Sequence, residues 1–435
     1  MANQTWTDKY RLAPALPVFT DPPDLEYWGD LRDQAMDVIA ASARLEGAVS
    51  TKTAEALGDH LRLMNSFHSN LIEGHKTFIP DIEKAMSKEF SGDNAATYAQ
   101  ELCAAHVRAE KEIMRAVLNQ SDSNVSHPEF IQHVHQAFYS HLPDHHQYTH
   151  EETGFTTHPI NAGVFRNHFI GVNRGTMPLG PTPEELPDTM KAFGRIFDPG
   201  NFRSEEKLLA AAVGHLKLAW IHPFSDGNGR TVRLYSGFFL ARCGINRSNL
   251  WSLSRGFSHN KAEYMGSLFA GDPQPLDGNR ERIEFQPENV AMFAKHFLDT
   301  CHDQIHFMGD MLSLRNVSNQ IDAYVAHRSA IDKTFRPETG RLLRAIFTNG
   351  EMTRPEAYGM LETGAWSQKT AQRIVTGLLE DGLLRQKNSR SPLSVGLPPH
   401  ALPIYFPKLY DVATVGADKM KEYMAFKGKP SREKE

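Results

Sequence analysis

The sequence predicts a mostly helical protein with a short β-hairpin near its middle and a winged helix-turn-helix near its C-terminal end. Apolar residues recur at helical spacing over most of the chain. Glycines and prolines gather between Pro143 and Pro187, and this segment should form loops and the hairpin. Near the C-terminal end, three helical patterns precede extended segments, which is typical of a winged helix.

Composition narrows the class of protein. At 435 residues, the chain is too long for one compact core and should form two or three domains. A net charge of −5 argues against nonspecific coating of nucleic acid or anionic membrane. Three widely spaced cysteines favour reduced thiols over a disulfide framework. Met1 to Pro17 lacks a signal-peptide pattern, and the most apolar helix, Leu208 to Trp220, is too short to span a bilayer. We therefore expect a cytoplasmic protein.

Helical patterns run through the first third of the chain. They cover about Leu31 to Met86, with a break near Gly74 to Pro80, and continue from about Ala95 to Leu118 and from Pro128 to Leu142. The expected units are an N-terminal helical region at residues 1–94, a central core at 95–326, a winged helix at 327–410 and a C-terminal tail at 411–435.

Two helices of the central core should face a short loop. The first carries an apolar stripe at helical spacing, formed by Leu209, Val213, Leu216 and Trp220. After a loop at residues 221–229, the second helix continues until Gly244, a residue suited to end a helix. The region from there to about His327 should again be helical.

Three helices and two strands are expected in the C-terminal module. The second helix begins with Thr353 and Glu356 at capping-box spacing, and the third begins near Ser367. The strands are expected at Leu383 to Lys387 and near Ile404 to Phe406. Together these elements would make a winged helix-turn-helix.

The segment from Ile221 to Arg233, IHPFSDGNGRTVR, carries the clearest chemistry. Gly227 and Gly229 lie where one helix ends and the next begins, so backbone N–H groups and the helix dipole can converge on a phosphate. Arg230 and Arg233 are three residues apart and should project on one face of the new helix. They would grip the β- and γ-phosphates of a triphosphate.

Three further side chains of this segment have expected roles. Asp226 offers the hard oxygen ligand that Mg²⁺ prefers. His222 can take a proton near neutral pH. Phe224, between them, should plug the core and fix the loop.

The segment resembles the signature of the Fic family, which reads His, any, Phe, any, Asp or Glu, Gly, Asn, Gly, Arg, any, any, Arg. All eight specified positions match, at His222, Phe224, Asp226, Gly227, Asn228, Gly229, Arg230 and Arg233. A plain turn with arginines on a solvated face is the alternative, and eight matches in one frame weigh strongly against it.

The resemblance implies a nucleotidyltransferase with a Fic helical core that moves AMP from ATP to a protein hydroxyl. His222 would deprotonate a Ser, Thr or Tyr hydroxyl of a protein target, or of the enzyme itself. Asp226 would hold Mg²⁺ or Mn²⁺, and Asn228 would help to fix the α- and β-phosphates. Gly229 favours AMP transfer, because a relative that phosphorylates a translation factor carries Lys there. Phosphocholine transfer shares the motif and stays open.

The same resemblance implies a flap and an adenine pocket. Gly163 to Arg166, followed by His168 to Val172, matches the segment with which the family docks a target peptide by strand addition. Gly163 and Arg166 would belong to this flap, although a purely structural hairpin is an alternative. Tyr264 and Leu268 would contact adenine, with ordinary core packing as the alternative.

A second family pattern, Ser, three residues, Glu and Gly, matches Ser69, Glu73 and Gly74 in an inhibitory helix at about residues 66–74. By resemblance, Glu73 would pair with Arg233 and displace the γ-phosphate, because a carboxylate and a phosphate compete for one guanidinium. Such a Glu can also position a water for removing AMP. The alternative is a surface residue near a helix end.

Two other sequence patterns, a histidine cluster and a basic patch, predict a function less specifically. Histidines cluster between His127 and His150, but their spacing suits no single helix face with a carboxylate partner, so we expect no metal site there. The expected winged helix carries a modest basic patch, with Lys369 and Arg373 on its third helix and Arg385, Lys387 and Arg390 around the wing. It could serve DNA, a docked protein or a homodimer. A nucleotide-sensing transcriptional regulator is therefore the rival function.

Overall fold

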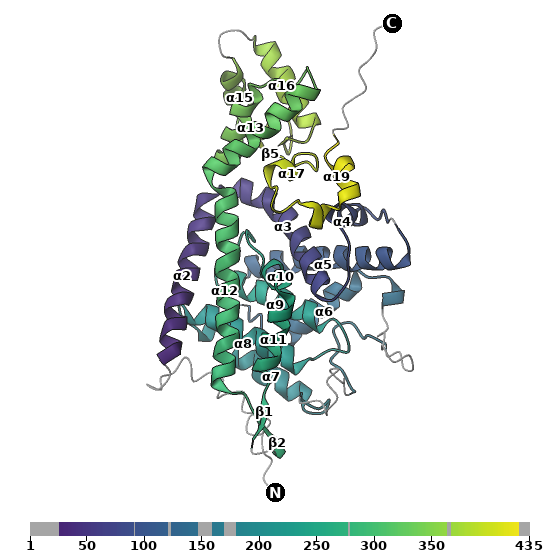
Figure 1. Ribbon diagram of the computed structural model, residues 1–435, viewed down its shortest axis with the longest axis vertical. Helices are drawn as coiled ribbons and strands as arrows, with labels where there is room; N and C mark the ends of the chain where they lie inside the picture. The colour runs from purple at the N-terminus through teal and green to yellow at the C-terminus, as the bar shows by residue number, and fades with distance from the viewer. Residues whose placement is uncertain are drawn as a thin grey trace.

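The computed structural model describes residues 26–90, 92–120, 123–146, 159–168, 180–276, 279–362 and 367–425. Helices dominate these residues, as Figure 1 shows, and the mostly helical fold predicted from the sequence is confirmed. Within the described residues, no helix combines the length and the apolar character that a membrane span requires.

The helices fall into three groups along the chain. The first elements are α2 (Glu26–Ala48), α3 (Thr51–Ile72), α4 (Ile79–Met86), α5 (Asn94–Asn119), α6 (Pro128–Ser140), η3 (Asp144–His146), α7 (Leu186–Ile196) and η4 (Pro199–Asn201). The central elements are α8 (Glu206–Ile221), α9 (Asn228–Arg242), α10 (Leu253–His259), α11 (Lys261–Gly271), β1 (Gln274–Leu276), β2 (Asn279–Glu284), α12 (Pro287–Leu312) and α13 (Leu314–Ile331). The last elements are α14 (Thr339–Asn349), β3 (Glu351–Met352), α15 (Arg354–Leu361), α16 (Gln368–Glu380), β4 (Leu384–Arg385), β5 (Leu393–Val395), α17 (Leu402–Tyr405), α18 (Val412–Val415) and α19 (Ala417–Tyr423).

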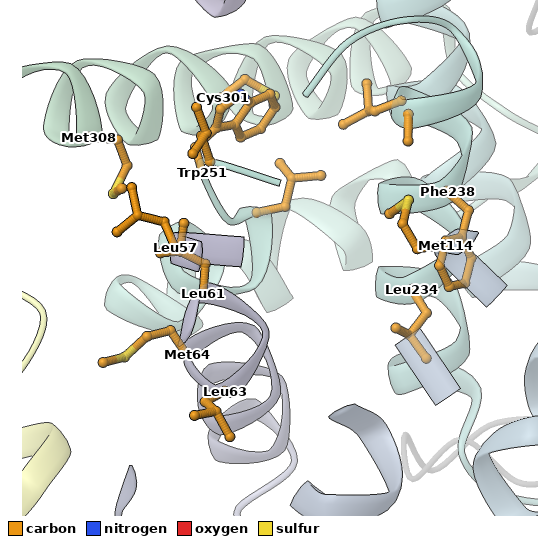
Figure 2. Packing of buried hydrophobic residues seen from close by; sticks show 14 of the residues in the cluster. Leu57, Leu61, Leu63, Met64, Met114, Leu234, Phe238, Trp251, Cys301 and Met308 are labelled. Atoms are coloured by element: carbon orange, nitrogen blue, oxygen red, sulfur yellow. The ribbon is translucent and has the colours of Figure 1, made fainter. Parts of the chain in front are cut away.

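Helix α3 runs between the central helices and the C-terminal elements (Figure 1). It begins at Ser50, whose hydroxyl accepts the backbone N–H of the third residue that follows. Its buried side chains recur at spacings of three and four residues, and they include Leu57, Leu61 and Met64. Figure 2 shows Leu57 and Leu61 within the same packed cluster as Trp251. The burial of this stripe holds α3 against the central helices.

The N-terminal end of α3 also contacts the C-terminal module. Thr53 donates from its Oγ1 to the carbonyl of Phe347 at 2.7 Å, and this bond is buried. The carbonyl belongs to the last turn of α14, where the helix itself supplies no partner. Thr53 therefore satisfies a group that the end of α14 would otherwise leave unpaired.

Helix α8 is the central helix of the core. Nearly all of its residues are buried, which agrees with a helix that is apolar on all sides, and it packs against α2, α9 and α12. It ends at His222, and α9 begins after Gly227, whose φ of 75° suits a residue without a Cβ. The two helices therefore face a loop of only a few residues, as predicted.

Two expectations about β-structure were wrong. The region after Gly244 is not all helical, because β1 and β2 form an antiparallel hairpin that helical periodicity does not reveal. The Asp277-Gly278 pair was the overlooked signal, since this dipeptide favours hairpin turns. The segment near Ile404 to Phe406 is not a strand, because residues 402–405 form α17.

The C-terminal strands instead form a three-stranded antiparallel sheet with the order β3-β5-β4. Helix α14 precedes β3, and α15 and α16 lie between β3 and β4 in the chain. The capping box of Thr353 and Glu356 is present at the start of α15. The winged-helix assignment and the bounds of the four expected units stay predictions. The hairpin expected between Pro143 and Pro187 lies mostly outside the described residues.

Candidate active site

The loop between α8 and α9 is braced by Asn228. Its Oδ1 accepts the backbone N–H of Phe224 at 2.9 Å, and its Nδ2 donates to the Phe224 carbonyl at 2.7 Å. Phe224 is fully buried, as expected for a plug, and stacks on His135 with ring centroids 3.9 Å apart. The Asn228 side chain thus holds the shape of the loop, and its contact with phosphate stays a prediction.

His222 lies in an unusual backbone conformation. Its φ of 51° and ψ of 62° are uncommon for a residue with a Cβ, and such positions cluster at functional sites. Arg166 holds this turn, because its Nε donates to the His222 carbonyl at 2.8 Å and its backbone N–H donates to the Pro223 carbonyl at 2.9 Å. The sequence placed Arg166 in a flap, whereas the structure joins it to the backbone of the expected base.

The environment of His222 favours its neutral form. Burial lowers the pKa of the imidazole below its ordinary value, and the charge of Arg166 lowers it further. Hydrogen bonding to the backbone of Ala219 and the charges of Asp226 and Glu73 oppose this shift without reversing it. A neutral imidazole at neutral pH is the form that can accept a proton.

His135 connects two parts of the site that the sequence did not link. Its Nδ1 accepts the backbone N–H of Gly163 at 2.9 Å, and its Nε2 lies 3.1 Å from the Asp226 carbonyl. Because Nδ1 accepts, Nε2 carries the proton and donates to that carbonyl. Burial lowers the pKa of His135 to about 4, so the ring stays neutral. The histidine cluster thus contributes a structural bridge to the loop.

Asp226 presents an ionised carboxylate at the edge of the loop. Burial alone would raise its pKa, but the charge of Arg230, a hydrogen bond from the Gly227 backbone and one from Tyr139 hold the pKa below its ordinary value. Tyr139 donates from its hydroxyl to Oδ2 at 3.1 Å. Nearly half of the Asp226 side chain, 46%, is exposed. One ionised, accessible oxygen ligand fits Mg²⁺, which usually keeps several waters and phosphate oxygens.

Arg230 is buried at the start of α9 with much of its guanidinium unpaired. Its Nη2 lies 3.5 Å from Asp226 Oδ2, and the guanidinium carbon lies 4.8 Å from the ring centroid of Phe138. Its Nε and Nη1 are buried and have no hydrogen-bond partner among the described residues. Unpaired buried donors are costly, so they indicate a site for an anionic ligand.

Arg233 is paired with the end of α3. Its Nε donates to Ser69 Oγ at 2.9 Å, and its Nη2 donates to the Ser69 carbonyl at 3.0 Å. The same Nη2 lies 2.5 Å from Glu73 Oε1. The pairing of Glu73 with Arg233 that the resemblance implied is therefore present in the structure, and its inhibitory effect stays a prediction.

Glu73 is ionised in this position. Burial works to raise its pKa, but the charges of Arg233 and Arg230 and the hydrogen bond from Arg233 hold the pKa below its ordinary value. A Cβ on Gly229 would overlap Glu73 Oε1, so the absence of a side chain at position 229 leaves room for the carboxylate. Gly74 follows with a φ of 93° and ends the helical segment.

The remaining predicted contacts have mixed outcomes. Tyr264 is buried, its hydroxyl lies 2.9 Å from His215 Nε2, and its ring stacks on Phe257 at 4.2 Å. This packing agrees with the core alternative, and an adenine contact by Tyr264 stays a prediction. Leu268 is partly buried, and its adenine contact stays a prediction. The flap strand at residues 168–172 lies mostly outside the described residues.

Comparison with known proteins agrees with this geometry. The Fic/DOC family model matches residues 125–240, which include the whole signature loop and the segment that holds Arg166. This chain carries a Fic domain. The match leaves the N-terminal helices, with Glu73, and the C-terminal module outside it.

Two relatives share the domain. The protein adenylyltransferase Fic of Nematostella vectensis is 25% identical over 256 residues, which are 59% of this chain and 52% of the relative. The protein adenylyltransferase Fic of Drosophila ananassae is 41% identical over 86 residues, 20% of this chain and 17% of the relative. The chain thus spans about half the length of the Nematostella relative.

A solved structure is also similar. A Fic family protein from Desulfovibrio desulfuricans aligns over 83% of this chain and 95% of its own, with a TM-score of 0.47 and 16% sequence identity. At that level of similarity, no residue role passes from that protein to this chain.

Asn228→Ala should lower the free energy of unfolding by about 1–3 kcal/mol, because the N–H and carbonyl of Phe224 lose their partners in a buried loop. Denaturant unfolding followed by circular dichroism measures the change. The matched control is Asn201→Ala, which removes an exposed amide that donates to the Arg195 carbonyl. Equal losses in the two variants would show that Asn228 does not brace the loop.

Proposed function

We propose that this Fic domain protein transfers AMP from ATP to a Ser, Thr or Tyr hydroxyl of a protein. The observation that carries the proposal is Arg230, whose buried Nε and Nη1 have no hydrogen-bond partner among the described residues and lie beside a helix N-terminus. Both features attract phosphate oxygens. His222 and Asp226 lie in the same loop. A base, His222, and a metal ligand, Asp226, would therefore lie where a phosphate would bind.

The residues of the chain divide the reaction between them. The hydroxyl oxygen of the target attacks the α-phosphorus of ATP, and the bond to pyrophosphate breaks. The neutral imidazole of His222 takes the proton of that hydroxyl. Arg230, Arg233 and the loop amides stabilise the negative charge on the leaving group. Mg²⁺ held by Asp226 would neutralise part of the phosphate charge when bound.

The structure also suggests how this activity is restrained. Arg233 is already engaged by Glu73 and Ser69, so the γ-phosphate would have to displace a carboxylate to reach it. We infer that ATP then settles with its α-phosphorus misaligned. The same carboxylate could orient a water for AMP removal, which would make the enzyme work in both directions. The target protein, self-modification and phosphocholine as an alternative donor group are separate questions for experiment.

His222→Ala should abolish label transfer from α-labelled ATP while leaving ATP binding largely intact, because the variant loses the base and keeps the phosphate loop. The rate of AMP transfer, once Glu73 no longer restrains it, should fall as the pH drops through the pKa of His222, because a protonated imidazole cannot accept the proton. The midpoint should lie below the ordinary value of histidine, because burial lowers the pKa of His222. His133→Ala, at an exposed position of α6, is the matched control. Undiminished transfer by His222→Ala would rule out His222 as the base.

Glu73→Gly should raise AMP transfer about a hundredfold, because a freed Arg233 lets the triphosphate align, and misalignment costs rate on that order. Label incorporation into a lysate and into the protein itself measures the change at fixed Mg²⁺ and ATP. The double variant Glu73→Gly with His222→Ala should be silent. If Glu73→Gly transfers AMP no faster than wild type, Glu73 does not restrain the enzyme. If, in a chase with unlabelled ATP, wild type loses its label and Glu73→Gly keeps it, Glu73 takes part in removing AMP.

The rival function is regulation of transcription through the C-terminal module. Lys369 and Arg373 are exposed on α16, and Arg385 is exposed on β4, so the basic patch is accessible. We predict weak binding of duplex DNA that decreases with salt, because the contacts would be to phosphates. A gel-shift titration at low salt tests this, with the double variant Lys369→Ala and Arg373→Ala as the comparison. No binding by the wild type would assign the patch to protein docking or a homodimer.

A further inference from the structure

A buried carboxylate joins two adjacent histidines outside the phosphate loop. Glu101 of α5 places its Oε2 2.9 Å from Nε2 of His145 and 2.7 Å from Nε2 of His146. The three ligand atoms lie within 4.8 Å of one another. The histidine cluster therefore does have a carboxylate partner, and it comes from a helix more than forty residues earlier in the chain.

The surroundings fix this arrangement. Only 10% of the Glu101 side chain and 1% of the His146 side chain are exposed. Tyr98, one turn before Glu101 on α5, stacks on the His146 ring with centroids 3.9 Å apart. His145 keeps 58% of its side chain exposed, so one side of the group faces solvent. Two of the three groups are thus oriented in advance, and a small ion can reach them.

The geometry points to a zinc-class metal site formed by Glu101, His145 and His146. Two imidazole nitrogens and one carboxylate oxygen are a ligand set that Zn²⁺ accepts and Mg²⁺ does not favour. Bond lengths of roughly 2.0–2.2 Å in a tetrahedral site require ligand atoms about 3.3 Å apart. The two distances from Glu101 Oε2 to the histidine nitrogens, 2.9 and 2.7 Å, need to open by roughly half an ångström to reach that geometry. A water from the exposed side would complete four ligands.

This site shares no ligand with the Mg²⁺ site that Asp226 would form, and its ligand set suits a different class of metal. It would tie η3 to α5. Tyr98 also contacts His75, with ring centroids 5.7 Å apart, and His75 follows Glu73 and Gly74 in the chain. Two ring contacts, from His146 to Tyr98 and from Tyr98 to His75, would therefore connect the metal to the segment that carries Glu73.

Zinc titration of the full chain tests the proposal without any readout of transfer. The chain is stripped with a chelator and dialysed, Mg²⁺ is added in excess, and Zn²⁺ is titrated against a chromophoric zinc indicator. Wild type should bind one Zn²⁺ per chain, and Glu101→Gln and His145→Ala should each weaken binding at least about tenfold. Glu101→Gln keeps the side-chain shape and His145 is exposed, so both variants should fold; circular dichroism without zinc checks this.

The matched control is the double variant His302→Ala and His306→Ala. These histidines lie on an exposed face of α12 with their Nε2 atoms 3.0 Å apart, and they form a surface pair without a carboxylate. The control should bind Zn²⁺ as the wild type does. The proposal is overturned if Glu101→Gln and His145→Ala bind like wild type, if only the control loses zinc, or if the wild type binds none.

Discussion

The guanidinium of Arg233 lies between the end of α3 and the phosphate loop. Arg233 lies in the first turns of α9, and its guanidinium donates hydrogen bonds to Ser69 and Glu73 at the end of α3. A guanidinium offers one fork of donors, so a carboxylate and a phosphate cannot both occupy it. We propose that the position of α3 controls whether the loop can receive a triphosphate in a productive orientation.

Helix α3 in turn connects distant parts of the molecule. Its C-terminal end carries Glu73, its buried middle packs in the cluster with Trp251, and Thr53 near its N-terminal end bonds to the last turn of α14. Figure 1 shows the C-terminal elements stacked beyond that end. The helix that holds the carboxylate on Arg233 is thus supported by both the Fic domain and the C-terminal module.

Much of the fold and of the site follows from local patterns in the sequence. Helical periodicity predicted α5, α8 and α9, because these helices bury apolar side chains, and Gly244, with a φ of 82°, follows the end of α9 as expected. The loop motif predicted the grouping of His222 and Asp226 because they lie a few residues apart. The pairing of Glu73 with Arg233 spans 160 residues and came only from the resemblance.

Other contacts could not be predicted because they depend on packing between distant segments. Arg166 reaches the His222 carbonyl across 56 residues, and His135 reaches Asp226 across 91. Glu101 meets two histidines from another element for the same reason. The burial of Tyr264 could not be predicted either, because spacing alone does not show which face of α11 is buried.

Competition for Arg233 is tested most directly by comparing the affinities of ATP and ADP. Both nucleotides are titrated, with Mg²⁺, into wild type and into Glu73→Gln, which keeps the size of the side chain and removes its charge. In the wild type, the γ-phosphate should add little, so ATP and ADP should bind with similar affinity. In Glu73→Gln, ATP should bind about tenfold more tightly than ADP, because one charge-assisted contact is gained. An unchanged ratio of the two affinities would contradict the competition between Glu73 and the γ-phosphate.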